Sequence, residues 1–206
     1  MNYLGHLYFS NNNTELMLSN LYGDFVKGSN LEAYTESVQK GIRLHRAIDN
    51  YIDTHPEVLK LKRLLYNELP KISGVAVDLF FDHLLAKNWT NYHELPLTEF
   101  LEHFYSCKIS SEVHYSLDFL GFIDAMRTHQ WLNHYPSEYG LRKSCEGVSS
   151  KISFPNTLKI GHIVFKNHEE EITSCFKKYM YDAQEYFKIK DWQFILTIHL
   201  FVEFLK

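Results

Sequence analysis

Apolar residues recur at helical spacing through most of this sequence, whereas strand-like alternation never persists for more than about four residues. In the range Thr35–Asp53, for example, Val38, Ile42, Ile48 and Ile52 follow a nearly helical period. The chain has only nine glycines and five prolines in 206 residues, which are few turn signals for a many-stranded sheet. We therefore predict an all-α fold made of long helices.

The same periodicity predicts helices in seven further ranges: Thr14–Gly23, Glu57–Tyr66, Gly74–Trp89, Pro96–Tyr105, Leu117–His134, Glu138–Val148 and Asn167–Phe187. With 45% hydrophobic residues, the 206-residue chain can bury one core of useful size, and we expect a single domain. The segment Trp192–Leu205 is strongly apolar, but it is shorter than a membrane span and contains His199 and Glu203. A buried terminal helix is favoured there over a membrane-surface or oligomer contact.

The composition excludes some classes of protein. A formal net charge of −4 argues against a nucleic-acid-binding protein whose affinity rests on a basic surface. Cys107, Cys145 and Cys175 are widely spaced and form no CxxC motif, so we expect free thiols in a reducing cytoplasm. The segment Met1–Ser10 lacks the basic region and the long apolar core of a signal peptide.

The first candidate site residues are His45 and Asp49. They are four residues apart, so on a helix they lie on one face about one turn apart. An imidazole and a carboxylate at this spacing can bind one cation, or the carboxylate can orient the imidazole. Asp53 continues the same row. A solvated His/Asp pair on an exposed helix face is the alternative.

A second signal lies in Gly74–Trp89, where Asp78 and Asp82 are four residues apart within an almost continuous apolar run. Buried carboxylates are costly unless they are paired, protonated or bound to metal, so a shared cation is favoured. His83 follows Asp82 directly and need not face the same cluster. Asp78 could instead be a partner for Arg46 or for a tyrosine hydroxyl.

His6 and Asp24 are a third signal, because each lies among apolar residues in the segments NYLGHL and NLYGDFV. For each residue alone, a satisfied hydrogen bond in the core is an alternative explanation. Together with the other candidates, they offer imidazole and carboxylate ligands with no thiolate. Such a set suits Mn²⁺, Fe²⁺ or Zn²⁺, and also Mg²⁺ if water completes the shell.

Several segments, in this order and spacing, resemble the acyl carrier protein phosphodiesterase family: MNYLGHLYFS, GDFVKG, GIRLHRAIDNYID, VDLFFDHLLAKNW and the triplet Gln130-Trp131-Leu132. The similarity is dense over Met1–Glu99, thinner to about residue 190 and absent in Trp192–Lys206. The family resembles a divergent HD-type metal phosphohydrolase, which implies a helical bundle of the HD-domain kind. The adjacent pair Asp82-His83 reverses the usual His-Asp order.

The resemblance implies metal-dependent hydrolysis of holo-acyl carrier protein to the apo form and 4′-phosphopantetheine, usually with Mn²⁺. The residues that we expect to bind the metal and activate water are His6, Asp24, His45, Asp49 and Asp82. His83 and Asp78 are expected to support them or to transfer protons. Arg46, whose planar group suits a phosphate oxygen, is the expected phosphate ligand, with a solvated helix arginine as the alternative.

A carrier protein would bring acidic helices to the enzyme. Lys60, Lys62 and Arg63 belong to the most basic local stretch and are the predicted docking residues, although a charge run is often only a solvated face. A metal phosphohydrolase for a small molecule such as a nucleotide remains an alternative function. A helical binding module without metal is a further one. The sequence does not indicate an oligomeric state.

Overall fold

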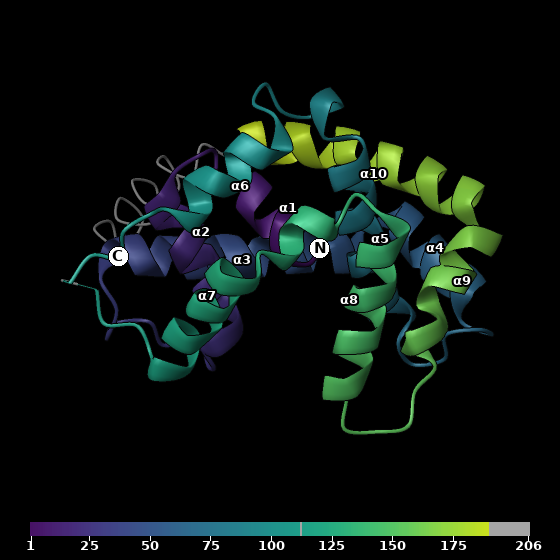
Figure 1. Cartoon of the computed structure of the whole chain (residues 1–206), viewed down its shortest axis with the longest axis horizontal. Coiled ribbons are helices and arrows are strands. Elements are labelled where there is room, and N and C mark those ends of the chain that lie inside the picture. The colour runs from purple at the N-terminus through teal and green to yellow at the C-terminus, as the bar shows by residue number, and fades with distance from the viewer. Residues whose placement is uncertain (112, 190–206) are drawn as a thin grey trace, which may run out of the picture.

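Figure 1 shows the computed structural model, which describes residues 1–111 and 113–189. Within these ranges every regular element is a helix, so the predicted all-α fold is confirmed. The α-helices are α1 (Tyr3–Tyr8), α2 (Thr14–Leu21), α3 (Glu36–Thr54), α4 (Pro56–Leu65), α5 (Ser73–Lys87), α6 (Leu97–Tyr105), α7 (Leu117–His129), α8 (Glu138–Lys151), α9 (Gly161–Asn167) and α10 (Glu169–Ile189). Short 3₁₀ helices are η1 (Tyr22–Phe25), η2 (Trp89–Asn91), η3 (Trp131–His134) and η4 (Leu158–Ile160). The segment Trp192–Leu205 lies outside the described residues.

The long helix α3 packs closely against α2. Gly41 makes this approach possible, because a Cβ atom at its position would lie only 2.1 Å from the Oγ atom of Ser19 on α2. Ser19 itself donates its hydroxyl to the carbonyl of Glu15 within its own helix. The 3₁₀ helix η1 follows α2 directly, so close packing of α2 on α3 also brings η1 against α3.

Helix α5 is buried on almost all sides, as its continuous apolar sequence predicts. Phe80 and Phe81 are fully buried. The ring of Phe81 packs against Phe176 and Tyr179 of α10, with ring centroids 5.4 and 5.3 Å apart. These contacts place α5 in the core and lay α10 across it.

Most predicted helix limits agree with the structure, but the segment Leu117–His134 is two elements. Helix α7 ends at His129 because Gln130 adopts a left-handed conformation, with φ 46°. Such a residue cannot continue an α-helix, and η3 begins directly after it. The short helices α1 and α9 were not predicted, since each has fewer residues than a periodic pattern needs to be recognised.

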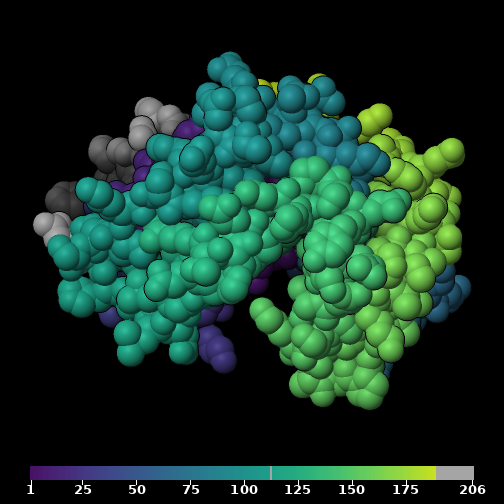
Figure 2. Space-filling model, viewed as in Figure 1, coloured from purple at the N-terminus to yellow at the C-terminus, as the bar shows by residue number. Residues whose placement is uncertain are grey.

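Helices α7 and α8 extend from the same side of the molecule in Figure 1. The space-filling view in Figure 2 shows that the surface is hollowed between these two helices, with atoms of the N-terminal segment at the base of the hollow. Among the described residues, no helix is both long enough and apolar enough to cross a membrane.

Candidate metal centre

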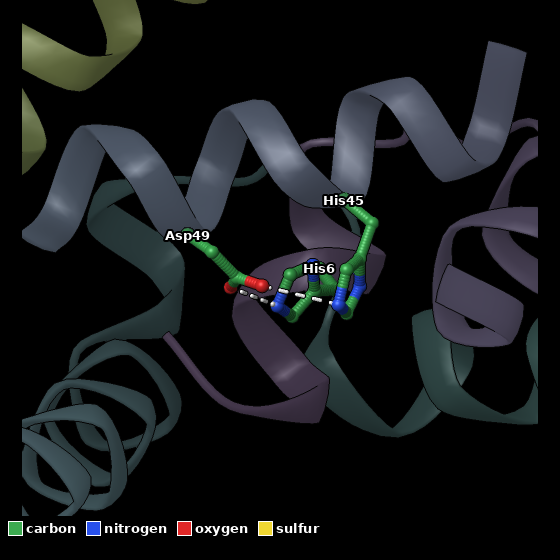
Figure 3. Close-up of side chains that lie close together, drawn as sticks. All are labelled: His6, His45 and Asp49. Carbon is green, nitrogen blue, oxygen red and sulfur yellow. Dashed lines mark ion pairs between the residues drawn. The ribbon is translucent and has the colours of Figure 1, made fainter. Parts of the chain in front are cut away.

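His6, His45 and Asp49 converge at one point, although they come from two helices (Figure 3). Nε2 of His45 lies 3.1 Å from one carboxylate oxygen of Asp49, and Nε2 of His6 lies 3.2 Å from the other. The two imidazole rings stack, with their centroids 4.3 Å apart. One potential ligand atom of each residue lies within 4.8 Å of those of the other two, which is a suitable arrangement for binding one metal ion.

The local sequence explains why α3 presents two of these residues. His45 and Asp49 are one turn apart on the helix face that also buries Val38, Ile42 and Ile52. As expected from their spacing, their side chains meet. His45 is buried, whereas the Asp49 side chain is 46% exposed, so the pair lies at the boundary between core and solvent.

Gly23 in η1 makes room for the ring of His45. A Cβ atom at position 23 would lie 2.3 Å from Cγ of His45, closer than two carbon atoms can approach. The absence of a side chain there lets η1 pass directly over the imidazole. Asp24, the next residue, then reaches His45, and its Oδ1 atom lies 3.3 Å from Nε2.

Asn20 holds His6 in one tautomer. Its side-chain nitrogen donates to the carbonyl of His6 at 2.9 Å and to the hydroxyl oxygen of Ser10 at 3.0 Å. The amide oxygen of Asn20 therefore faces Nδ1 of His6, at 2.9 Å, and Nδ1 must be the donor. In a neutral ring, the Nε2 atom that faces Asp49 consequently carries a lone pair.

The electrostatics of His6 favour a cation between it and Asp49. Burial lowers the pKa of His6, so its ring is neutral near pH 7. A lone pair that faces a carboxylate oxygen at 3.2 Å is repulsive unless a cation lies between them. A histidine that donates one ring nitrogen to an orienting group and offers the other to a shared cation is the usual arrangement of a metal-bound imidazole. The residues present therefore fit a metal ion.

The pKa of His45 is shifted in the opposite direction from that of His6, because the carboxylates of Asp24 and Asp49 both lie close to its Nε2 atom. Although burial works against the charged ring, hydrogen bonds to Asp24 and Asp49 raise the pKa of His45 to about 9. Burial alone would raise the pKa of Asp49, but the interactions with His45 and His6 together outweigh it and hold that pKa well below its usual range. Near pH 7, a proton on His45 thus occupies the position where a metal ion would bind.

His6 and Asp49 of the cluster line a cleft of about 390 Å³. Four aspartates contribute to its lining: Asp24, Asp49, Asp53 and Asp78. Lys151 at the end of α8 supplies positive charge on the opposite wall. A cleft with a cation site, several carboxylates and one lysine can bind a phosphate ester.

Three other aspartates singled out in the sequence, Asp24, Asp78 and Asp53, line the cleft. Asp24 touches His45, as described above, and its side chain is 53% exposed, so it can reach water in the cleft. Asp78 also lines the cleft, where its Oδ1 atom accepts a hydrogen bond from the Met1 amine at 2.9 Å. Asp53 lines the cleft too, but it is paired with Lys62 at 2.6 Å. Asp24 and Asp78 thus both face the cleft.

Asp82 is not among the described residues whose ligand atoms lie together with those of His6, His45 and Asp49. Its oxygens instead accept the backbone N–H groups of Leu4 at 2.8 Å and Gly5 at 3.1 Å, at the beginning of α1. Burial raises the pKa of Asp82 to about 7, although these N–H groups oppose the shift. This geometry favours a role in holding the helix that carries His6 over direct metal binding.

His83 and Arg46 are engaged with backbone carbonyls away from the cleft. Nδ1 of His83 donates to the carbonyl of Tyr135 at 2.7 Å, and its ring packs edge-on against Phe165. Arg46 donates to the carbonyls of Val26 and Gly28, at 3.3 and 2.7 Å, and ties the loop after η1 to α3. Neither residue is part of the cleft lining, so these contacts do not favour the roles expected from the sequence.

The predicted docking residues lie on α4. Lys60 pairs with Glu57 at 2.5 Å, and Lys62 pairs with Asp53 on the rim of the cleft. Arg63 is exposed. Two of these three cations are therefore already paired within the chain, which reduces the charge available to a partner.

Sequence reasoning missed three residues that shape the site: Asn20, Gly23 and Lys151. Asn20 interrupts the buried run from Met17 to Leu21, and an amide in such a run is the signal that could have identified it. Gly23 and Lys151 carry no such signal, because their role depends on which distant element packs against them.

Comparison with known proteins gives a consistent result. A family model described as acyl carrier protein phosphodiesterase matches residues 1–183. A protein of that name from Enterobacter sp. (strain 638) is 27% identical over 177 residues, which cover 85% of this chain and 92% of the relative. One from Photorhabdus laumondii is 32% identical over 139 residues, covering 66% and 69% of the two chains. One from Escherichia coli O45:K1 is 28% identical over 157 residues, covering 73% and 79%.

No solved structure matches this chain, so the expected likeness to HD-type enzymes stays a prediction. The family match includes all of α1 to α9 and most of α10, and with them each residue of the metal cluster. It ends before Trp192–Lys206, where the sequence showed no resemblance. This chain therefore belongs to the acyl carrier protein phosphodiesterase family.

Proposed function

We propose that this protein hydrolyses holo-acyl carrier protein to apo-acyl carrier protein and 4′-phosphopantetheine. The observation that carries the proposal is the His6, His45 and Asp49 cluster, of which His6 and Asp49 line a cleft with further carboxylates, in a chain of this family. A metal-dependent phosphodiesterase needs such a combination of cation ligands, proton acceptors and space for a phosphate group.

The metal would be held by Nε2 of His6, Nε2 of His45 and the carboxylate of Asp49. Asp24 is near enough to His45 to serve as a further oxygen ligand or as a proton acceptor. Nitrogen and oxygen ligands without a thiolate suit Mn²⁺, which is our proposed ion, and Fe²⁺ or Mg²⁺ are compatible with the same set. When bound, a divalent cation would polarise the phosphoryl group and lower the pKa of a water molecule beside it.

The reaction consumes one water molecule. The oxygen of that water forms a bond to phosphorus, and the bond from phosphorus to the serine Oγ of the carrier protein breaks. The proton lost by water goes to a carboxylate, for which Asp24 is the best placed because it is exposed beside His45. The serine Oγ takes up a proton from water in the cleft as it leaves.

The carrier protein would meet the rim of this cleft. Lys62 lies there through its pair with Asp53, and Lys60 and Arg63 are on the same helix. An acidic helix of the partner could compete with Asp53 and Glu57 for these cations. Reversal of their charge should raise KM for the carrier protein with little change in kcat, and more so at low salt.

The experiment that tests the function is incubation of the purified protein with holo-acyl carrier protein and Mn²⁺, followed by mass spectrometry of the carrier. We expect the carrier to lose the mass of the 4′-phosphopantetheine group, and chelation of the metal to prevent the loss. Hydrolysis of free nucleotides without any loss from the carrier would instead select a small-molecule phosphohydrolase. No activity, together with no Mn²⁺ binding, would indicate a binding module.

A further inference from the structure

A second cavity, of about 420 Å³, lies beside the metal cleft. It runs between η3 with the end of α7 on one side and α8 on the other, within the hollow seen in Figure 2. The two cavities share Asn2, Tyr3, Val148 and Lys151 as lining residues. The two cavities therefore adjoin, and His6 and Asp49 of the cluster line only the cleft.

The second cavity differs from the metal cleft in chemistry. Aspartates line the cleft, whereas the neighbouring cavity has none and is walled by the aromatic side chains of Tyr3, Trp131, Tyr135 and Tyr139. Asn2, Ser144, His129 and His134 lie among these rings, and the cavity also has Lys151 at its junction with the cleft and Lys143, whose charge is paired with Glu146. Aromatic faces with scattered amide and hydroxyl groups suit a neutral, extended ligand that has both methyl groups and amides.

Gly147 keeps this cavity open. A Cβ atom at its position would have no heavy atom within 4 Å, and the residue is one of the lining residues on α8. A side chain at this position would thus begin in open space at the lining of this cavity. Lys151, one turn further along α8, lies where the two cavities meet.

We infer that this aromatic groove between η3 and α8 binds the pantetheine arm, with Lys151 contacting the phosphate at the junction. The inference rests on the proposed function. The arm is a neutral chain of about twelve bonds with two amides, which extends roughly 14 Å from the phosphate, as about four residues of extended peptide would. The aromatic-walled space suits such a chain better than the cleft that four aspartates line, and it adjoins that cleft. The gem-dimethyl group would pack on the aromatic rings, and the amides would pair with Asn2 and Ser144.

The first test compares Gly147→Leu with Gly121→Leu. Gly121 is also an exposed helical glycine with no heavy atom within 4 Å of its Cβ position, but it does not line the groove. Leucine favours helices over glycine, so both variants should fold. We measure kcat/KM for holo-carrier protein and for bis(p-nitrophenyl) phosphate, which has no pantetheine arm. The value of kcat/KM for holo-carrier protein, divided by that for bis(p-nitrophenyl) phosphate, should fall by about tenfold or more in Gly147→Leu. In Gly121→Leu this ratio should stay at the wild-type value.

A second test needs no turnover. A thiol placed by Gly147→Cys should react with a maleimide, and S-methyl 4′-phosphopantetheine, which has no free thiol to consume the reagent, should slow this reaction while inorganic phosphate does not. The thiol of Gly121→Cys should react at the same rate with either compound present. Protection by a nucleotide but not by S-methyl 4′-phosphopantetheine would overturn the assignment in favour of a base-binding groove.

The outcomes separate this inference from the proposed function. If the wild-type protein releases no 4′-phosphopantetheine from the carrier protein, the proposed function is wrong. If the wild type does release it, but Gly147→Leu keeps the wild-type ratio and the thiol at position 147 is not protected, the groove assignment alone is overturned.

Discussion

The Nε2 atom of His6 faces a carboxylate oxygen of Asp49 at 3.2 Å, while Asn20 fixes the ring so that this nitrogen has no proton to offer. The two helices that carry these residues thus bring together two electron-rich atoms. Such an arrangement is stable near pH 7 when a cation is shared between them. This relationship supports His6, His45 and Asp49 as a candidate metal site.

Substitution of a cluster histidine should remove metal binding. We expect His45→Ala to lower the affinity for Mn²⁺ by at least about 100-fold, since it removes a direct ligand. His103→Ala is the matched control, because His103 is exposed on α6 and should leave Mn²⁺ affinity unchanged. Titration calorimetry measures both. Equal affinities in the two variants would contradict the site.

Asn20 should act through the orientation of His6. Asn20→Leu removes the acceptor of Nδ1, and we expect about 10- to 100-fold weaker Mn²⁺ binding and a loss of about 1–3 kcal/mol in the free energy of unfolding. Ser10→Ala removes two hydrogen bonds of the same network, from Asn20 to the Ser10 hydroxyl and from that hydroxyl to the carbonyl of His6, but keeps the contact between Asn20 and Nδ1. It should therefore lower stability slightly and retain Mn²⁺ affinity. A variant at Asn20 that binds Mn²⁺ normally would show that the tautomer is not controlled this way.

Gly23 should be intolerant of even one methyl group. Gly23→Ala would place a Cβ atom against the His45 ring, and overpacking of this kind costs about 1–3 kcal/mol. We expect weaker Mn²⁺ binding as well, because η1 and Asp24 must move. Gly121→Ala, in open space, should be neutral or slightly stabilising. Urea denaturation of the two metal-free variants provides the comparison.

Mn²⁺ affinity should rise with pH. The pKa of His45 is raised to about 9 in the metal-free protein, so metal binding at lower pH must displace that proton. The pKa of His6 is lowered, and this residue has no proton to lose near pH 7. We therefore expect Kd to fall by about tenfold per pH unit between pH 7 and 8, with release of about one proton. Calorimetry in buffers of different ionisation enthalpy counts the protons.

The same shift predicts how the stability of the metal-free protein depends on pH. The folded pKa of His45 is above its usual value of 6.5, so its charge stabilises the fold fully below pH 6.5. This contribution should be lost as pH rises from there through about 9. In His45→Ala, the fall in unfolding free energy across this range should be smaller. An identical pH profile for both proteins would contradict the shift.

Asp82→Asn should destabilise the protein. An amide can accept only one of the two N–H groups that the carboxylate holds, and its own N–H group faces the other. We expect a cost of about 1–3 kcal/mol and lower activity, partly restored by excess Mn²⁺, because α1 and His6 are displaced. Asp124→Asn, at an exposed position on α7, is the control. Unchanged stability with complete loss of Mn²⁺ binding would identify Asp82 as a direct ligand.

The sequence by itself determined the helices and part of the site. Helical periodicity is a local property, so α3 and α5 could be predicted closely, and the spacing of His45 and Asp49 required that they share a face. The order of motifs also indicated the family. The short helix α1 could not be predicted, because its first N–H groups are satisfied by Asp82 from the distant helix α5.

Only the tertiary structure decided which polar residues share the metal site. His6 lies beside α3 because Gly41 and Gly23 let α2 and η1 approach α3 closely. Spacing in the sequence does not reveal which helix surfaces meet. Arg46 and Asp82 have plausible chemistry for a phosphate and a metal, but backbone groups of other elements use their hydrogen-bonding atoms. Lys151 and Gly147 gain their importance from the packing of α8 beside the N-terminal segment. A residue's chemistry is encoded locally, but its partners are set by the packing of helices far apart in the chain.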